Sequence, residues 1–189
     1  MSKYKSRYNY NLVWIDLEMT GLDIEKDVIL EIATLVTNNE LDILAKGPAL
    51  VINQKNEILE QMSSWCIKHH TASGLVEAVK QSTITIEEAE LKTLDFLKEY
   101  TVPEGSVLCG NSVWQDRNFI RKYMKNLDEF LNYRIIDVSS IKELVNRWYP
   151  NSSKSNFVKP DGHRALEDII YSVEELKHYR TYFFLPPLD

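Results

Sequence analysis

Residues 12–19 read Leu12-Val13-Trp14-Ile15-Asp16-Leu17-Glu18-Met19, a short apolar run that two carboxylates interrupt. Such a run predicts a buried strand. Side chains alternate between the faces of a strand, so Asp16 and Glu18 project from one face, about 7 Å apart along the chain. Two such carboxylates repel each other and resist desolvation unless a cation lies between them. Because hard divalent cations prefer oxygen ligands, the pair points to phosphoryl transfer assisted by a metal ion.

The composition predicts one ordinary domain in an unexported protein. Of the 189 residues, 44% are hydrophobic and 11% aromatic, enough for a substantial core. The chain shows neither a run of about 18 apolar residues nor a signal-peptide core, so we expect a cytoplasmic protein with no membrane association. Cys66 and Cys109 suggest neither a metal cluster nor a disulfide framework and are expected to be small core residues.

The net charge of −6 argues against an extended, sequence-independent grip on long nucleic acid. A site that holds one or two phosphates through metal ions and a few positioned cations needs no basic surface. The charge therefore leaves room for a nuclease that acts on short substrates.

The remaining pattern predicts a mixed α/β sheet flanked by helices. Strands are expected at 12–19, 28–37, from about 41 to 44 or beyond, 107–110 and 134–138. Helical patterns occur between 56 and 81, at 86–100, after Ser112, at 140–148 and from about Arg164. Thr85 with Glu88 predicts a capping box, and Asn111-Ser112 is expected to cap the next helix. We expect residues 1–10 to be an N-terminal extension and 11–189 a single domain.

Three polar residues near expected helix starts complement the acidic pair. Asp116 follows a short buried strand, and His163 and Asp168 lie at the entrance of the last helix. Taken singly, each has an ordinary interpretation. Asp116 suits a helix N-terminus, Asp168 suits a solvated position beside a buried face, and His163 suits the surface.

Taken together, the order Asp-x-Glu, Asp, then His-x-x-x-x-Asp resembles the DEDDh family of 3′-to-5′ exonucleases. Five ordered blocks are similar to the oligoribonucleases of that family: WIDLEMTGL at 14–22, EIATLV at 31–36, HTASGL at 70–75, GNS at 110–112, and YR with DVS at 133–139. The catalytic positions show no departure, whereas the first ten residues match nothing in the family. The resemblance implies a ribonuclease H-like exonuclease domain that degrades short RNA, especially dinucleotides, to 5′-mononucleotides.

The resemblance also implies a catalytic role for each polar residue. Asp16, Glu18 and Asp168 would hold one divalent ion, Mg²⁺ or Mn²⁺, with Asp16 bridging to a second ion that Asp116 supports. His163 would be the general base for the attacking water, since the ordinary histidine pKa is about 6.5. Five residues of helix turn through about 140°, so a helical His163 would point away from Asp168. We therefore expect His163 on a mobile loop that closes over the site.

The implied substrate-binding residues are Leu22, Trp65, His70, Ser112, Tyr133, Arg134 and Ser139. Leu22 would wedge between two bases and Trp65 would stack on one. The others would contact the 5′ phosphate, with Tyr133 reaching in from the second subunit of a homodimer. From the residues alone, Ser112 also suits a helix cap, Trp65 a core position and Tyr133 an interface rim.

Two other functions remain open from the sequence. A DEDDh exonuclease that trims longer DNA or RNA ends would show activity that rises with chain length. A catalytically silent nucleotide-binding or dimerisation module would be expected to lack one of the four carboxylates, and all four are present.

Overall fold

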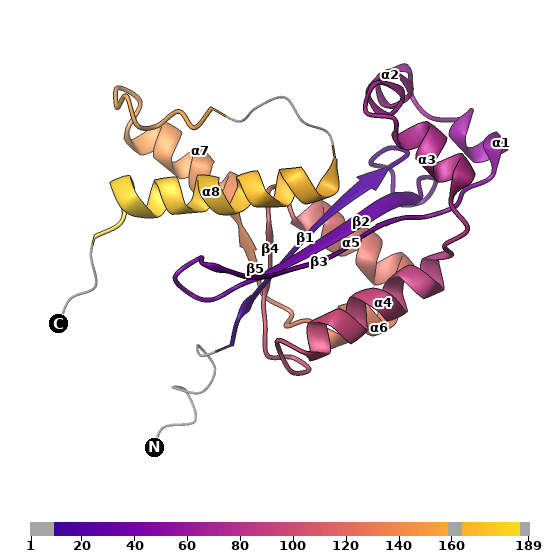
Figure 1. Ribbon diagram of the computed structural model, residues 1–189. Coiled ribbons are helices and arrows are strands. Elements are labelled where there is room, and N and C mark those ends of the chain that lie inside the picture. The colour runs from indigo at the N-terminus through magenta and orange to yellow at the C-terminus, as the bar shows by residue number, and fades with distance from the viewer. Residues whose placement is uncertain (1–9, 159–163, 186–189) are drawn as a thin grey trace.

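The structure is a computed structural model that describes residues 10–158 and 164–185. The strands are β1 (Leu12–Met19), β2 (Ile29–Thr37), β3 (Ile43–Val51), β4 (Leu108–Gly110) and β5 (Ile135–Asp137). The helices are α1 (Asn56–Leu59), α2 (Ser64–Ala72), α3 (Leu75–Gln81), α4 (Ile86–Lys98), α5 (Trp114–Tyr123), α6 (Lys125–Phe130), α7 (Val138–Trp148) and α8 (Ala165–Phe183). These elements confirm the predicted mixed sheet with flanking helices (Figure 1).

The five strands form one sheet in the order β3-β2-β1-β4-β5, with β1 at its centre. β1 pairs with β2, and β2 with β3, in antiparallel fashion, whereas β1–β4 and β4–β5 are parallel. The parallel pairing of β1 with β4 extends only to Trp14 opposite Cys109. The carboxyl half of β1 therefore runs beyond β4, and this is where the acidic pair lies.

β1 divides its side chains between two layers of helices. Val13, Ile15 and Leu17 pack in a core with α4, α5 and α6, whereas Trp14 belongs to a second core with α7 and α8. Asp16 and Glu18 alternate in phase with Trp14 and so face the second layer. In Figure 1, α8 crosses the sheet on that side, where it packs against β1 and β2.

The predicted local signals were partly right. The capping box is present, because Glu88 N donates to Thr85 Oγ1 and Thr85 N donates to Glu88 Oε2. The predicted cap by Asn111-Ser112 is wrong, since the N-cap of α5 is Val113, whose side chain accepts no hydrogen bond. Ser112 instead has a φ of 49° and its hydroxyl donates to another serine.

The structure changes one helix bound and agrees with the expected cysteine positions. α7 begins at Val138, two residues earlier than expected, because the side chain of Asp137 caps it by accepting from Ser139 N. Cys66 and Cys109 are buried and unpaired, as expected. Within the described residues, no helix combines the length and apolar composition that crossing a bilayer requires.

Candidate active site

Three predicted metal ligands meet between β1 and α8. Asp16, Glu18 and Asp168 each offer a carboxylate oxygen, and the three oxygens lie within 4.8 Å of one another. Asp168 is buried, and Asp16 and Glu18 are partly exposed. Because carboxylate oxygens are the ligands that hard divalent cations prefer, the cluster is suited to such an ion. The structure therefore brings together the three residues that the sequence analysis assigned to one metal site.

Asp116 approaches β1 from the helix layer on the opposite side of the sheet. Its Oδ1 accepts a hydrogen bond of 2.9 Å from Leu17 N, beyond the point where β4 stops pairing with β1. Burial raises the pKa of this carboxyl to about 7, and the nearby charge of Asp137 adds to the effect, while the bond from Leu17 N opposes it. Asp116 thus lies beside the strand that carries Asp16 and Glu18, outside the group of three.

An ion pair between a buried glutamate and a partly exposed arginine, which the sequence analysis did not predict, fixes the start of α8. Glu31 on β2 lies opposite Glu18 in the β-ladder and is 1% exposed. Its carboxylate accepts from Arg164 Nη2 at 2.6 Å and from Ala165 N at 3.3 Å, so it binds the residues at the N-terminus of α8. Hydrogen bonding to Glu31 raises the pKa of the Arg164 guanidinium, and the negative charge of Glu18 adds to the effect. The sequence offered one signal of this pair, because Glu31 is a charged residue inside the apolar run of β2.

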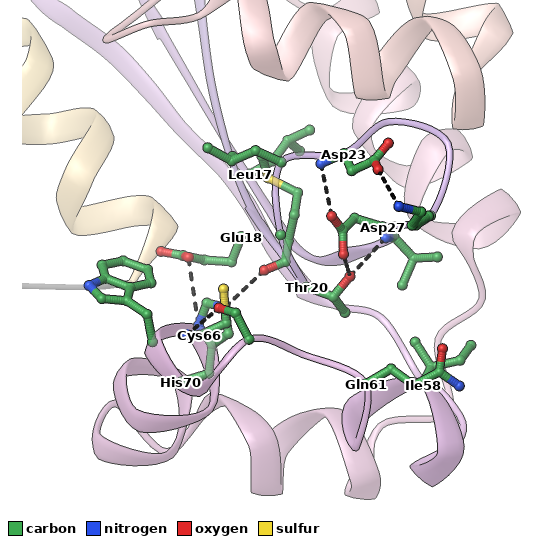
Figure 2. A pocket seen from close by; sticks show the side chains of 16 residues that line it. Leu17, Glu18, Thr20, Asp23, Asp27, Ile58, Gln61, Cys66 and His70 are labelled. Carbon is green, nitrogen blue, oxygen red and sulfur yellow. Dashed lines mark hydrogen bonds and ion pairs between the residues drawn. The ribbon is translucent and has the colours of Figure 1, made fainter.

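A cavity of about 870 Å³ opens beside Glu18 and is lined by three of the predicted substrate residues (Figure 2). Leu22 and Trp65 are 71% and 59% exposed, which excludes the core interpretation of Trp65. His70 is buried, and its Nε2 donates to Met19 O at 2.9 Å while Nδ1 lies 3.8 Å from Glu18 Oε2. His70 therefore contacts a metal-ligand candidate directly.

The predicted serine pair lies together at the end of β5. Ser112 Oγ donates to Ser139 Oγ at 3.2 Å, and Ser112 N donates to the same Ser139 oxygen and to Asp137 Oδ1 at 3.0 Å. Asn111, whose side chain bonds to Ser172 Oγ on α8, links this corner to the last helix. The hydroxyls are thus fixed by the loop after β4 and by the cap of α7.

Tyr133 and Arg134 form a separate exposed pair before β5. The Arg134 guanidinium stacks over the Tyr133 ring, 4.3 Å from its centroid, and Tyr133 is 70% exposed. The pair precedes the edge strand of the sheet, two strands away from β1, which carries Asp16 and Glu18. The predicted general base, His163, lies outside the described residues.

Known proteins match this chain over most of its length. Residues 13–176 match the family described as Exonuclease (RNase_T). An oligoribonuclease of Actinobacillus pleuropneumoniae serotype 5b (strain L20) is 54% identical over 93% of this chain and 95% of its own length. The mitochondrial oligoribonuclease of Homo sapiens is 51% identical over 94% of this chain and 75% of its own length.

Solved structures share the fold at much lower identity. Exonuclease I from Methylocaldum szegediense has a TM-score of 0.69 at 14% identity, over 92% of this chain and 41% of that one. The zinc-bound form of an E. coli exonuclease I–ssDNA complex has the same TM-score at 13% identity, over 93% of this chain and 41% of that one. This chain spans about two fifths of those longer proteins.

The sheet, its carboxylate cluster and the family match define an exonuclease domain. Identity above 50% over nearly the whole chain narrows the class further. The chain belongs to the oligoribonuclease family, which confirms the resemblance seen in the sequence.

Proposed function

We propose that this chain hydrolyses short RNA from the 3′ end, dinucleotides above all, and releases 5′-mononucleotides. Family membership makes the chain a 3′-to-5′ exoribonuclease. The observation that carries the finer proposal is the meeting of three carboxylates from β1 and α8 beside a cavity with two exposed apolar side chains. A compact site of this kind suits a substrate of one or two bases.

The three carboxylates fit a divalent cation, because all the ligand atoms are oxygens and two of the side chains are partly open to solvent. We propose that Asp16, Glu18 and Asp168, with support from Asp116, would hold two divalent ions, Mg²⁺ or Mn²⁺. When bound, such ions stabilise the attacking and leaving oxygens of an in-line displacement. The E. coli exonuclease I–ssDNA complex is a zinc-ion-bound form, so a protein of this fold holds a divalent cation.

The protein's own groups would place and deprotonate the reactants. His163 is proposed to take the proton from the attacking water, a role that rests on its position in the family motif. The Glu31–Arg164 pair would hold the start of α8, and with it Asp168, in register with β1. His70 would fix the Glu18 carboxylate through the close approach of Nδ1 to Oε2.

Substrate recognition is proposed to come from the exposed groups around the cluster. Leu22 would separate the two bases and Trp65 would stack on one of them. Ser112, Ser139 and Arg134 are proposed to bind the 5′ phosphate, and the hydrogen-bonded serine pair supports a phosphate site at that corner. His70 was predicted to join them, but its two ring nitrogens approach Met19 O and Glu18 Oε2, so it is proposed to act through Glu18.

We propose a homodimer in which Tyr133 completes the site of the other subunit. Its ring is largely exposed and stacked by Arg134, immediately before the edge strand β5. A rigid aromatic group at an edge is suited to an interface. We further propose that residues 11–189 act as a single exonuclease domain, preceded by a ten-residue extension.

The test compares hydrolysis of a 5′-phosphorylated RNA dinucleotide with that of a 20-nucleotide RNA, in excess Mg²⁺ or Mn²⁺ and again with chelator. We expect fast, chelator-sensitive cleavage of the dinucleotide and slow trimming of the longer strand. Preference for the longer strand would retain the exonuclease chemistry and reject the proposed substrate length. Absence of cleavage in every condition would favour a silent binding module.

A further inference from the structure

The loop that carries Leu22 is tied into one shape by a single carboxylate. Asp27 Oδ1 accepts from Thr20 Oγ1 at 2.7 Å, and Asp27 Oδ2 accepts from Asp23 N at 2.8 Å (Figure 2). The backbone closes the same turn, since Asp27 N donates to Asp23 O at 2.8 Å. A Cβ at Gly21 would lie 2.4 Å from Asp27 Oδ2, so the carboxylate packs directly against the residue before Leu22. This loop comprises residues 20–28.

Side chains of helix α5 donate hydrogen bonds to backbone carbonyl groups of this loop. Gln115 Nε2 donates to Leu22 O at 2.8 Å, and Tyr123 Oη donates to Asp27 O at 2.7 Å. Lys122 Nζ donates to Ile24 O between these two points. Positions 115, 122 and 123 share one helix face, because seven or eight residues make about two turns. The loop therefore cannot shift along α5 without breaking these bonds.

Gln115 has a special place among these donors. It binds the carbonyl of Leu22 itself, and it precedes Asp116, whose carboxylate binds Leu17 N on β1. One turn of α5 thus contacts both the strand that bears the acidic pair and the exposed leucine that borders the cavity. Two adjacent residues, Gln115 and Asp116, therefore fix the position of Leu22 relative to the acidic pair on β1.

We propose that Gln115 is a specificity-determining positioning residue, which holds Leu22 at the distance from the carboxylate cluster that suits a dinucleotide. The inference rests on the proposed function, in which Leu22 separates the two bases. An unbound exposed leucine on a loop would sample several positions, and ordering it on binding would weaken affinity. By fixing the Leu22 backbone beforehand, Gln115 lowers the KM for dinucleotides without taking part in bond breaking.

The test uses Gln115→Met, which keeps the length of the side chain and removes the donor. Two substrates are compared: a 5′-phosphorylated RNA dinucleotide, and the p-nitrophenyl ester of a nucleoside 5′-monophosphate, which has no second base for Leu22 to separate. We expect the dinucleotide KM to rise about threefold to tenfold, the scale of one lost hydrogen bond, with kcat little changed. For Gln115→Met, kcat/KM for the ester should stay within about twofold of wild type. The control Asn118→Ala, on the same helix, should leave kcat/KM within about twofold of wild type for both substrates.

A double-mutant cycle with Leu22→Ala separates this role from a general structural one. If Gln115 acts through Leu22, Gln115→Met in the Leu22→Ala background has no further effect on dinucleotide KM. Independent, additive effects overturn the inference, as does an equal loss on both substrates, which would place the effect at Asp116 or in the fold. Equal dinucleotide turnover by Gln115→Met and wild type overturns this inference and leaves the proposed function intact. A wild-type protein that leaves the dinucleotide intact overturns the proposed function and this inference with it.

Discussion

The carboxylate cluster and the recognition surface are built in opposite ways. Asp16, Glu18 and Asp168 stand on a central strand and a long helix, with buried cores beneath both elements. Leu22, Trp65 and the other apolar groups assigned to substrate are exposed and lie on a loop or a short helix. The proposed metal ligands are thus placed by the core, whereas the proposed recognition residues depend on local hydrogen bonds at the surface. Mutations should therefore separate the two regions cleanly.

The largest effect on activity is expected from substitution of Asp168. Asp168→Asn keeps the volume and removes one metal-ligand charge, so kcat should fall by at least about a thousandfold, roughly 4 kcal/mol of transition-state stabilisation. The Tm of the metal-free protein should not fall, because the substitution relieves repulsion from Asp16 and Glu18. The rise in Tm on adding Mn²⁺ should be lost. Wild-type rates in this variant would mean that the motif assignment is wrong.

Trp65→Ala is expected to weaken substrate use without weakening the fold. Base stacking contributes about 1–3 kcal/mol, so kcat/KM for a dinucleotide should fall roughly fivefold to 150-fold. The Tm should change little because the ring is mostly exposed. Leu91→Ala, which truncates another exposed apolar side chain on α4, is the matched control and should leave both quantities unchanged. A Tm loss without a kinetic effect would return Trp65 to a structural role.

Tyr133→Ala tests whether recognition is shared between subunits. Dinucleotide turnover should fall about tenfold, on the scale of one lost aromatic or hydrogen-bond contact, with little change in Tm. Mixing this variant with Asp168→Asn should restore activity, because a mixed dimer would contain one site with intact carboxylates and an intact partner tyrosine. Activity of the mixture equal to the average of its parts would argue against a shared site.

Asp116 is also expected to affect the stability of the metal-free protein, and this effect depends on pH. Burial raises the folded-state pKa from 3.8 to about 7, so between these values the folded protein holds a proton that the unfolded chain has released. The stability of the metal-free protein therefore falls as pH rises through this range and stays low above it. Asp116→Asn retains an oxygen for Leu17 N and removes the ionisation cost.

Thermal unfolding in chelator should show this variant to be several degrees more stable than wild type at pH 8, with the difference shrinking toward pH 4.5. A difference that is constant with pH would contradict the raised pKa.

Much of the fold followed from local signals. The bounds of β1 and the capping box of α4 were predicted because a strand's apolar run and an N-terminal cap depend on neighbouring residues alone. The cap of α5 was not, since Ser112 and Asp137 turn toward each other only once β4 and β5 lie side by side. The start of α7 was misplaced for the same reason.

The residues of the candidate site also divide into those that the sequence patterns identified and those that depend on partners far away in the chain. Strand alternation and the family order together led to Asp16, Glu18 and Asp168, and the structure brings them together. Glu31 and Gln115 were missed, because their partners lie 133 and 93 residues away and neither pattern marks them. Cytoplasmic location and the closing of His163 over the site stay predictions.

The alternation of β1 has a consequence for how this gene tolerates change. One strand supplies Val13, Ile15 and Leu17 to the core on one side and both carboxylates to the other. Removing a single residue from its middle would reverse the faces of everything that follows, burying an acid where a leucine belongs. Insertions and deletions in β1 should therefore prevent folding, so their effect would appear before any effect on activity.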